Sequence, residues 1–266
     1  MDSNLFKSDK NLFFNYILKK KIKENIGINP FIALSFIDSI EIQNKNNTNY
    51  NKINSINIFK NLKLEKYNNS KIHIGYYSGD FRDHVMGFLL SEILKLHNKN
   101  NFKIIAFSLK NFKTNDLKNT IENYCDDFLD IQNYTDEEIV SISKNKKIDI
   151  AVDLMGYTTF NKISCFSRRL APIQINYLGY PGSTGLENID YIVADKFIIP
   201  EESKKFYSEK IIYMPNCYRP HYISKHTDNK FNRKYFSLPS ETFVFGCFNN
   251  SFKINPDMFQ IGRAHV

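Results

Sequence analysis

The chain has 266 residues, of which 42% are hydrophobic and 24% charged, so it can form one large globular domain with or without an appendage. We expect no membrane-spanning helix and no secretory signal, because no apolar run reaches about 18 residues and the start lacks the signal pattern. The net charge of +8 comes from lysines scattered among Asn and Ile, so we expect neither a nucleic-acid nor a membrane partner.

The first part of the chain predicts a short helical segment, residues 1–43. Helices are expected at residues 11–24 and 30–37, with Asn29 as the cap of the second and Pro30 at its first position. Residues 44–70 are rich in Asn and Lys and poor in apolar residues. We interpret them as a linker that contains one short helix.

From residue 71 the hydrophobic pattern alternates between strand and helix, which is typical of an α/β lobe whose parallel sheet is covered on both faces. We expect this lobe to span residues 71–238. Helices are expected at residues 85–97, from Leu117 to Phe128, and after Thr135, which forms a capping box with Glu138. Strands are expected at residues 72–77, 102–109, 148–154, 173–178, 191–193 and 211–213.

A second lobe is expected to begin at residues 239–260, with a strand over residues 244–248. Residues 261–266 resemble translated sequencing-adapter DNA, and we exclude them from the fold prediction. The four cysteines lack metal-binding spacing, so we expect reduced thiols in a cytoplasmic protein and no metal site.

The strand at residues 173–178 runs into a loop that is rich in glycine, residues 179–185. Glycine lets the backbone turn tightly and lets a ligand approach the main chain. Loops at the carboxyl ends of parallel strands are where open α/β folds bind ligands. The loop is therefore a candidate binding element, although a simple turn is the alternative.

Three stretches of the sequence together resemble the catalytic region of protein O-GlcNAc transferases, including Spindly-type members. They are residues 74–84 (IGYYSGDFRDH), residues 149–185, and residues 245–256 (FGCFNNSFKINP). The resemblance covers roughly residues 15–260 and includes the linking residues 191–210 in the same order. It is specific for the family and much less specific for the sugar donor or the acceptor.

The resemblance implies a GT-B glycosyltransferase, in which two Rossmann-like lobes face each other across a nucleotide sugar. Residues 71–238 would be the N-terminal lobe, and most of the second lobe would lie beyond this sequence, so we expect the chain alone to be inactive. Transfer of N-acetylglucosamine from UDP-GlcNAc to Ser and Thr hydroxyls of proteins is the implied reaction, without a cofactor. GDP-fucose as donor and a non-catalytic, partner-binding fragment are the alternatives.

Two residues are expected to be catalytic. The resemblance implies that Lys253 contacts the donor diphosphate, where its charge would stabilise the leaving group; a solvated surface lysine is the alternative. His84 begins a helix, with Asp83 as the expected cap, and a helix N-terminus disfavours the imidazolium form. A neutral imidazole can accept a proton or orient a hydroxyl, whereas local capping is the structural alternative.

The other candidates are expected to bind donor or acceptor. Asp80 could act in the site, but a structural ion pair with Arg82 is favoured. Asp153 could face the cleft, and a bond to loop amides is slightly favoured. The remaining candidates would bind phosphate or uracil, or form the sugar-facing wall, with Tyr180 equally suited to the core: Asn249, Asn250, Gly179, Tyr180, Pro181, Gly182 and Thr184.

Overall fold

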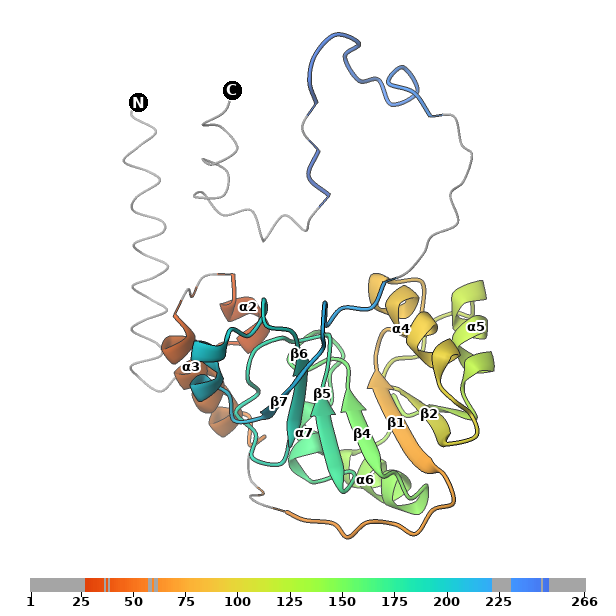
Figure 1. The fold of residues 1–266 in the computed structure, drawn as a ribbon, viewed down its shortest axis with the longest axis vertical. Coiled ribbons are helices and arrows are strands. Elements are labelled where there is room, and N and C mark those ends of the chain that lie inside the picture. The colour runs from red at the N-terminus through yellow and green to blue at the C-terminus, as the bar shows by residue number, and fades with distance from the viewer. Residues whose placement is uncertain are drawn as a thin grey trace. The chain divides into compact units, whose positions relative to one another are not determined.

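The computed structural model describes residues 27–35, 37, 39–56, 59, 62–221, 231–244 and 246–248. These residues fall into two compact units, one that includes residues 27–221 and one that includes residues 231–248 (Figure 1). The helix predicted at residues 11–24 and the adapter-like residues 261–266 lie outside the described residues.

The larger unit is built on a parallel sheet of seven strands in the order β3-β2-β1-β4-β5-β6-β7 (Figure 1). The six strands predicted within residues 71–238 form within a few residues of their expected bounds. The edge strand β3 was missed, because Phe128 was assigned to the preceding helix. That helix instead ends at Tyr124, and the Asp126 N–H bonds the Ile104 carbonyl, which aligns the chain beside β2. The strands are β1 (Ile72–Ser78), β2 (Phe102–Ser108), β3 (Asp127–Asp130), β4 (Ile150–Asp153), β5 (Ile173–Asn176), β6 (Tyr191–Ala194) and β7 (Lys210–Tyr213).

Helices cover both faces of the sheet, as the alternating pattern predicted. Helices α4 (Val85–Leu96) and α5 (Asp116–Tyr124) pack on one face. Helices α6 (Asp136–Asn145) and α7 (Ile163–Ser167) pack on the other. Side chains alternate along β1, so Tyr76 joins the first cluster and Tyr77 the second.

The capping box of Thr135 and Glu138 forms at the start of α6, as predicted. A 3₁₀ helix, η1 (Glu201–Phe206), lies between β6 and β7. Among the helices that the structure describes, none combines the length and apolarity that crossing a bilayer would require.

Residues 44–53, interpreted as part of a linker with one short helix, belong to a helix that begins before the linker and packs beside the lobe. Helix α2 (Pro30–Ala33) is capped by Asn29 as expected, although it stops short of residue 37. Helix α3 (Ile40–Ile53) then has 14 residues, and it packs beside the lobe near α2 (Figure 1). It has no apolar stripe. Its buried residues are asparagines: Asn46, Asn47, Asn49 and Asn51. Asn47 and Asn51 bond backbone and hydroxyl groups of the lobe, whereas Asn46 bonds the backbone of Ile28.

The described part of the second unit is small and exposed. Arg233 donates to the carbonyls of Pro239 and Thr242 at 2.7 Å each, and this holds one turn of chain. The strand expected at residues 244–248 does not form in the residues that are described there. A strand needs a hydrogen-bonded neighbour, and every described neighbour of this kind lies in residues 72–213.

Candidate functional site

The strand order brings two loops together at the carboxyl edge of the sheet. From β1 the chain continues to β2 and β3 on one side, whereas β4 leads to β5, β6 and β7 on the other. The loop after β1 (residues 79–84) and the loop after β4 (residues 154–162) diverge at this topological switch point, where open α/β sheets bind ligands. The loops touch, since the Gly79 N–H lies 3.3 Å from the Met155 sulfur.

The loop after β1 places three ionisable side chains at the switch point. Arg82 donates to the Asp80 carboxylate from Nε at 3.1 Å and from Nη2 at 3.0 Å, so the predicted ion pair is confirmed. The other oxygen of Asp80 lies 3.6 Å from Nδ1 of His84. The Asp80 side chain is only 11% exposed, whereas that of His84 is 39% exposed. A ligand can therefore reach the imidazole of His84, whereas the Asp80 carboxylate lies behind the imidazole and is shielded from solvent.

His84 itself caps helix α4. Its backbone is extended and its Nδ1 accepts the Met86 N–H at 3.3 Å, so the prediction of Asp83 as the cap is wrong. Asp83 is exposed and one residue too early to reach the first free amides of the helix. An imidazole that accepts through Nδ1 carries its proton on Nε2 when neutral, so the outer nitrogen of His84 is a donor in this arrangement.

Asp153 lies at the end of β4, below the switch point. Its carboxylate accepts from the backbone N–H groups of Met155 at 2.9 Å and Gly156 at 3.1 Å, which is the structural role that was favoured. The side chain is buried. Burial raises the pKa of Asp153 to about 6, although the two backbone bonds oppose this.

The glycine-rich loop lies beside the loop after β4, but its side chains do not form a wall for a ligand. The ring of Tyr180 is 1% exposed and belongs to the core, the alternative that was left open for it. Thr184 is fully buried, so its side chain does not face a ligand. Gly179 and Gly182 are close to neighbouring groups: a Cβ at Gly179 would lie 2.3 Å from a backbone oxygen, and one at Gly182 would lie 2.7 Å from the Tyr180 hydroxyl. Pro181 is half-buried.

Helix α3 holds this loop from one side, which the sequence analysis missed. The Asn47 amide donates to the Tyr180 hydroxyl at 3.0 Å and to the Ser183 carbonyl at 2.8 Å. One turn later, Asn51 donates to the Thr184 carbonyl at 3.0 Å. This contact could have been predicted from the sequence, because Asn47 and Asn51 are spaced by four residues and so lie on one face of a helix.

Glu209 holds the same loop from the other side. Its carboxylate accepts the Thr184 N–H at 2.7 Å and the Ser183 hydroxyl at 2.8 Å. The Thr184 hydroxyl is a further donor to it. Glu209 is buried, so these donors replace the water that a charged group would otherwise need.

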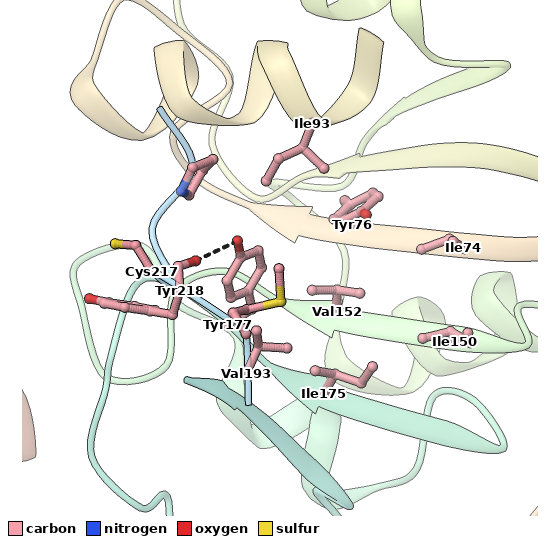
Figure 2. Close-up of a pocket in the computed structure, with 12 residues that line it drawn as sticks. Ile74, Tyr76, Ile93, Ile150, Val152, Ile175, Tyr177, Val193, Cys217 and Tyr218 are labelled. Atoms are coloured by element: carbon pink, nitrogen blue, oxygen red, sulfur yellow. Dashed lines mark hydrogen bonds between the residues drawn. The ribbon is translucent and has the colours of Figure 1, made fainter. Parts of the chain in front are cut away.

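A cavity of about 390 Å³ lies on the sheet face that α4 covers in part (Figure 2). Ile93 of α4 and the Tyr177 hydroxyl, which donates to the Tyr218 carbonyl at 2.8 Å, stand on opposite sides of it. Its lining is almost wholly apolar, and it contains none of the predicted site residues. The apolar lining offers no cation or amide for a diphosphate, so the carboxyl edge remains the candidate site.

Three predicted residues, Lys253, Asn249 and Asn250, lie outside the described residues. Across the described ranges, no group of three or more His, Cys, Asp and Glu side chains is arranged to hold a metal ion.

Comparison with known proteins agrees with the fold and the motifs. Residues 33–232 match the model of glycosyl transferase family 41. The probable UDP-N-acetylglucosamine–peptide N-acetylglucosaminyltransferase SEC of Arabidopsis thaliana is 33% identical over 194 residues, which is 71% of this chain and 20% of the relative. The corresponding probable enzyme SPINDLY of the same plant is 30% identical over 193 residues, 71% of this chain and 21% of the relative.

A solved structure shares the fold. A mutant O-GlcNAc transferase of Thermobaculum terrenum superposes with a TM-score of 0.65 at 23% identity, covering 68% of this chain and 35% of that one. The chain spans about one fifth of the length of the curated relatives named above. With three quarters of its length matched by one family model, the chain belongs to glycosyl transferase family 41.

Proposed function

We propose that the protein containing this chain transfers N-acetylglucosamine from UDP-GlcNAc to Ser and Thr hydroxyls of proteins. One observation carries the proposal: the loop with Asp80 and His84 lies at the topological switch point of a family 41 lobe. The relatives are named as probable UDP-N-acetylglucosamine–peptide N-acetylglucosaminyltransferases, which supports this donor and a polypeptide acceptor. A cytoplasmic setting, a nucleotide-sugar donor and a protein acceptor belong to the proposal.

The transfer breaks the bond between the sugar's anomeric carbon and the diphosphate, and forms a bond from that carbon to the acceptor oxygen. The acceptor hydroxyl loses a proton, and the diphosphate gains negative charge. We assign the first demand to the His84 side of the site and the second to Lys253. The acceptor would lie between residues 78–84 and the backbone of residues 179–185.

The capping arrangement limits what His84 can do without moving. With Nδ1 accepting from Met86, the neutral ring can donate from Nε2 to the acceptor oxygen and orient it. To take up the proton on Nε2, the ring must carry its own proton on Nδ1. Asp80, 3.6 Å away, is the carboxylate that would accept from that nitrogen after a small rotation. Asp80 would thus act through His84 as a positioning residue.

The test is transfer of radiolabelled N-acetylglucosamine from UDP-GlcNAc to an acceptor protein by the longer protein that includes the second lobe. His84→Ala and Lys253→Ala should each lower kcat by about 100-fold or more, as is usual when a positioned acid–base group or a charge stabiliser is lost. Thr48→Ala, on the exposed side of α3, is the matched control and should leave kcat unchanged. Near-full turnover by Lys253→Ala would refute the diphosphate assignment.

The same assay with GDP-fucose tests the alternative donor, because residues that read the nucleotide are expected in the second lobe. The 266-residue chain alone should transfer neither sugar. Turnover by the isolated chain would contradict the view that both lobes form the site, and no turnover by the longer protein would favour a partner-binding role.

A further inference from the structure

Four side chains from three loops form a continuous row at the switch point. The Arg82 guanidinium lies 4.3 Å from the centre of the Phe112 ring. The Phe112 and Phe160 rings meet edge to face with centres 5.8 Å apart. The Lys110 ammonium lies 5.9 Å from the Phe160 ring. The loops follow β1, β2 and β4, so the row crosses the carboxyl edge beside His84.

The backbone holds the Phe160 ring out of the core. Phe160 has φ of +65°, a conformation that L residues with a large side chain rarely adopt, and it is 40% exposed. A Cβ at Gly79 would lie 2.8 Å from the Phe160 Cβ, so the missing side chain at Gly79 allows Phe160 to sit against the first loop. A strained backbone that presents an aromatic ring at a ligand-binding edge suggests a binding role.

The charges of the row decide between possible ligands. Arg82 is already paired with Asp80 at 3.0 Å, whereas Lys110 has no ion pair with any residue that the structure describes. One free cation next to a carboxylate is poorly suited to a diphosphate. The two rings contact each other edge to face at 72°, so they offer no parallel slot for a base, whereas the 40% exposed Phe160 and the half-buried Phe112 present apolar surface to a ligand.

Building on the proposed function, we propose that the row of Arg82, Phe112, Phe160 and Lys110 binds the acceptor polypeptide. It would select a segment that carries an apolar side chain next to a carboxylate. The apolar side chain packs against the exposed surface of Phe160 and Phe112, and the carboxylate pairs with Lys110. The acceptor hydroxyl is thereby directed toward His84.

The test measures binding to the 266-residue chain without donor, by fluorescence anisotropy. The probes are a labelled peptide of four Glu-Val-Ser repeats and its counterpart of four Lys-Val-Ser repeats. The chain should prefer the acidic peptide. Phe160→Gly should weaken its binding at least fivefold, because glycine keeps the left-handed backbone and removes the ring. Lys110→Glu should weaken binding of the acidic peptide about tenfold and strengthen binding of the basic peptide.

Leu96→Ala is the matched control, because Leu96 is 78% exposed at the far end of α4. It should not change either affinity, and melting curves should show that all variants fold. The proposal would be overturned if the peptide did not bind, or if Phe160→Gly and Lys110→Glu left its affinity unchanged. It would also be overturned if UDP displaced the peptide and the same two substitutions weakened UDP binding. If the peptide binds through the row but the longer protein transfers no sugar, the proposed function fails and the peptide site stands.

Discussion

Replacing Asn47 by alanine tests whether α3 is an integral part of the lobe. The Asn47 amide is buried and donates to the Tyr180 hydroxyl and the Ser183 carbonyl, at 3.0 and 2.8 Å. Alanine removes both bonds and leaves these two buried groups without that donor. The chain should still fold, because no apolar core side chain is lost.

The cost follows from the groups left behind. Each buried polar group without its partner costs about 1–3 kcal/mol. Against this, Asn47 Oδ1 has no hydrogen-bond partner among the described residues, so its removal returns about 1 kcal/mol. The better helix propensity of alanine returns about 0.5 kcal/mol. With two groups left unpaired and about 1.5 kcal/mol returned, Asn47→Ala should lower the free energy of unfolding by about 0.5–4.5 kcal/mol, centred on about 2.5 kcal/mol.

Urea unfolding of the 266-residue chain, followed by far-UV circular dichroism at 25 °C, measures this change. Thr48→Ala is the control, since Thr48 is the next residue on α3 and is exposed. It should stay within about 0.5 kcal/mol of the parent. If Asn47→Ala and Thr48→Ala unfold at the same urea concentration, the helix is a loosely attached tether and the reasoning is wrong.

Three further changes have defined outcomes in the same assay. Leu90→Ala, at a fully buried position on the sheet-facing side of α4, should cost about 2–5 kcal/mol, and equal stability to Leu96→Ala would contradict the packing. Burial raises the pKa of Asp153 from 3.8 to about 6, so the folded state binds a proton more tightly than the unfolded chain. The stabilisation by the protonated carboxyl group is therefore complete below pH 4 and is lost as the pH rises through 6. Asp153→Asn should remove this pH dependence of the free energy of unfolding, which amounts to up to about 3 kcal/mol. An unchanged dependence on pH in the variant would refute the assignment to Asp153. Lys147→Gly should stabilise by about 1 kcal/mol, since Lys147 follows α6 with φ of +50°, and any loss would argue against strain there.

The strands and helices of the lobe were predictable because their hydrophobic pattern follows from which residues must be buried. A strand covered on both faces is a nearly continuous apolar run, so β1, β2 and β4 were placed within a few residues. Strand β3 was missed because its two partly buried apolar side chains, Phe128 and Leu129, continue the spacing of the helix before it. Hydrophobic periodicity cannot separate such short runs.

The site was predictable in position and less so in detail. Topology alone carries Asp80 and His84 to the switch point, because loops after adjacent parallel strands share an edge. The direction of a side chain in a loop depends on partners elsewhere in the sequence. Tyr180 turns inward because Asn47, 133 residues earlier, offers it a buried amide. The same distance in sequence explains why α3 was interpreted as a linker: its partners are polar and remote.

The polar face of α3 has a consequence for the nascent chain. Its partner loop is made 133 residues later, which at ribosomal rates is a delay of about 7–27 s. The central pair β1 and β4 also waits, since Ile74 pairs with Ile150. An apolar helix would expose a sticky surface throughout that interval. The asparagine amides can hydrogen-bond to water until the loop is synthesised, so the polar face of α3 exposes no aggregation-prone surface during that interval.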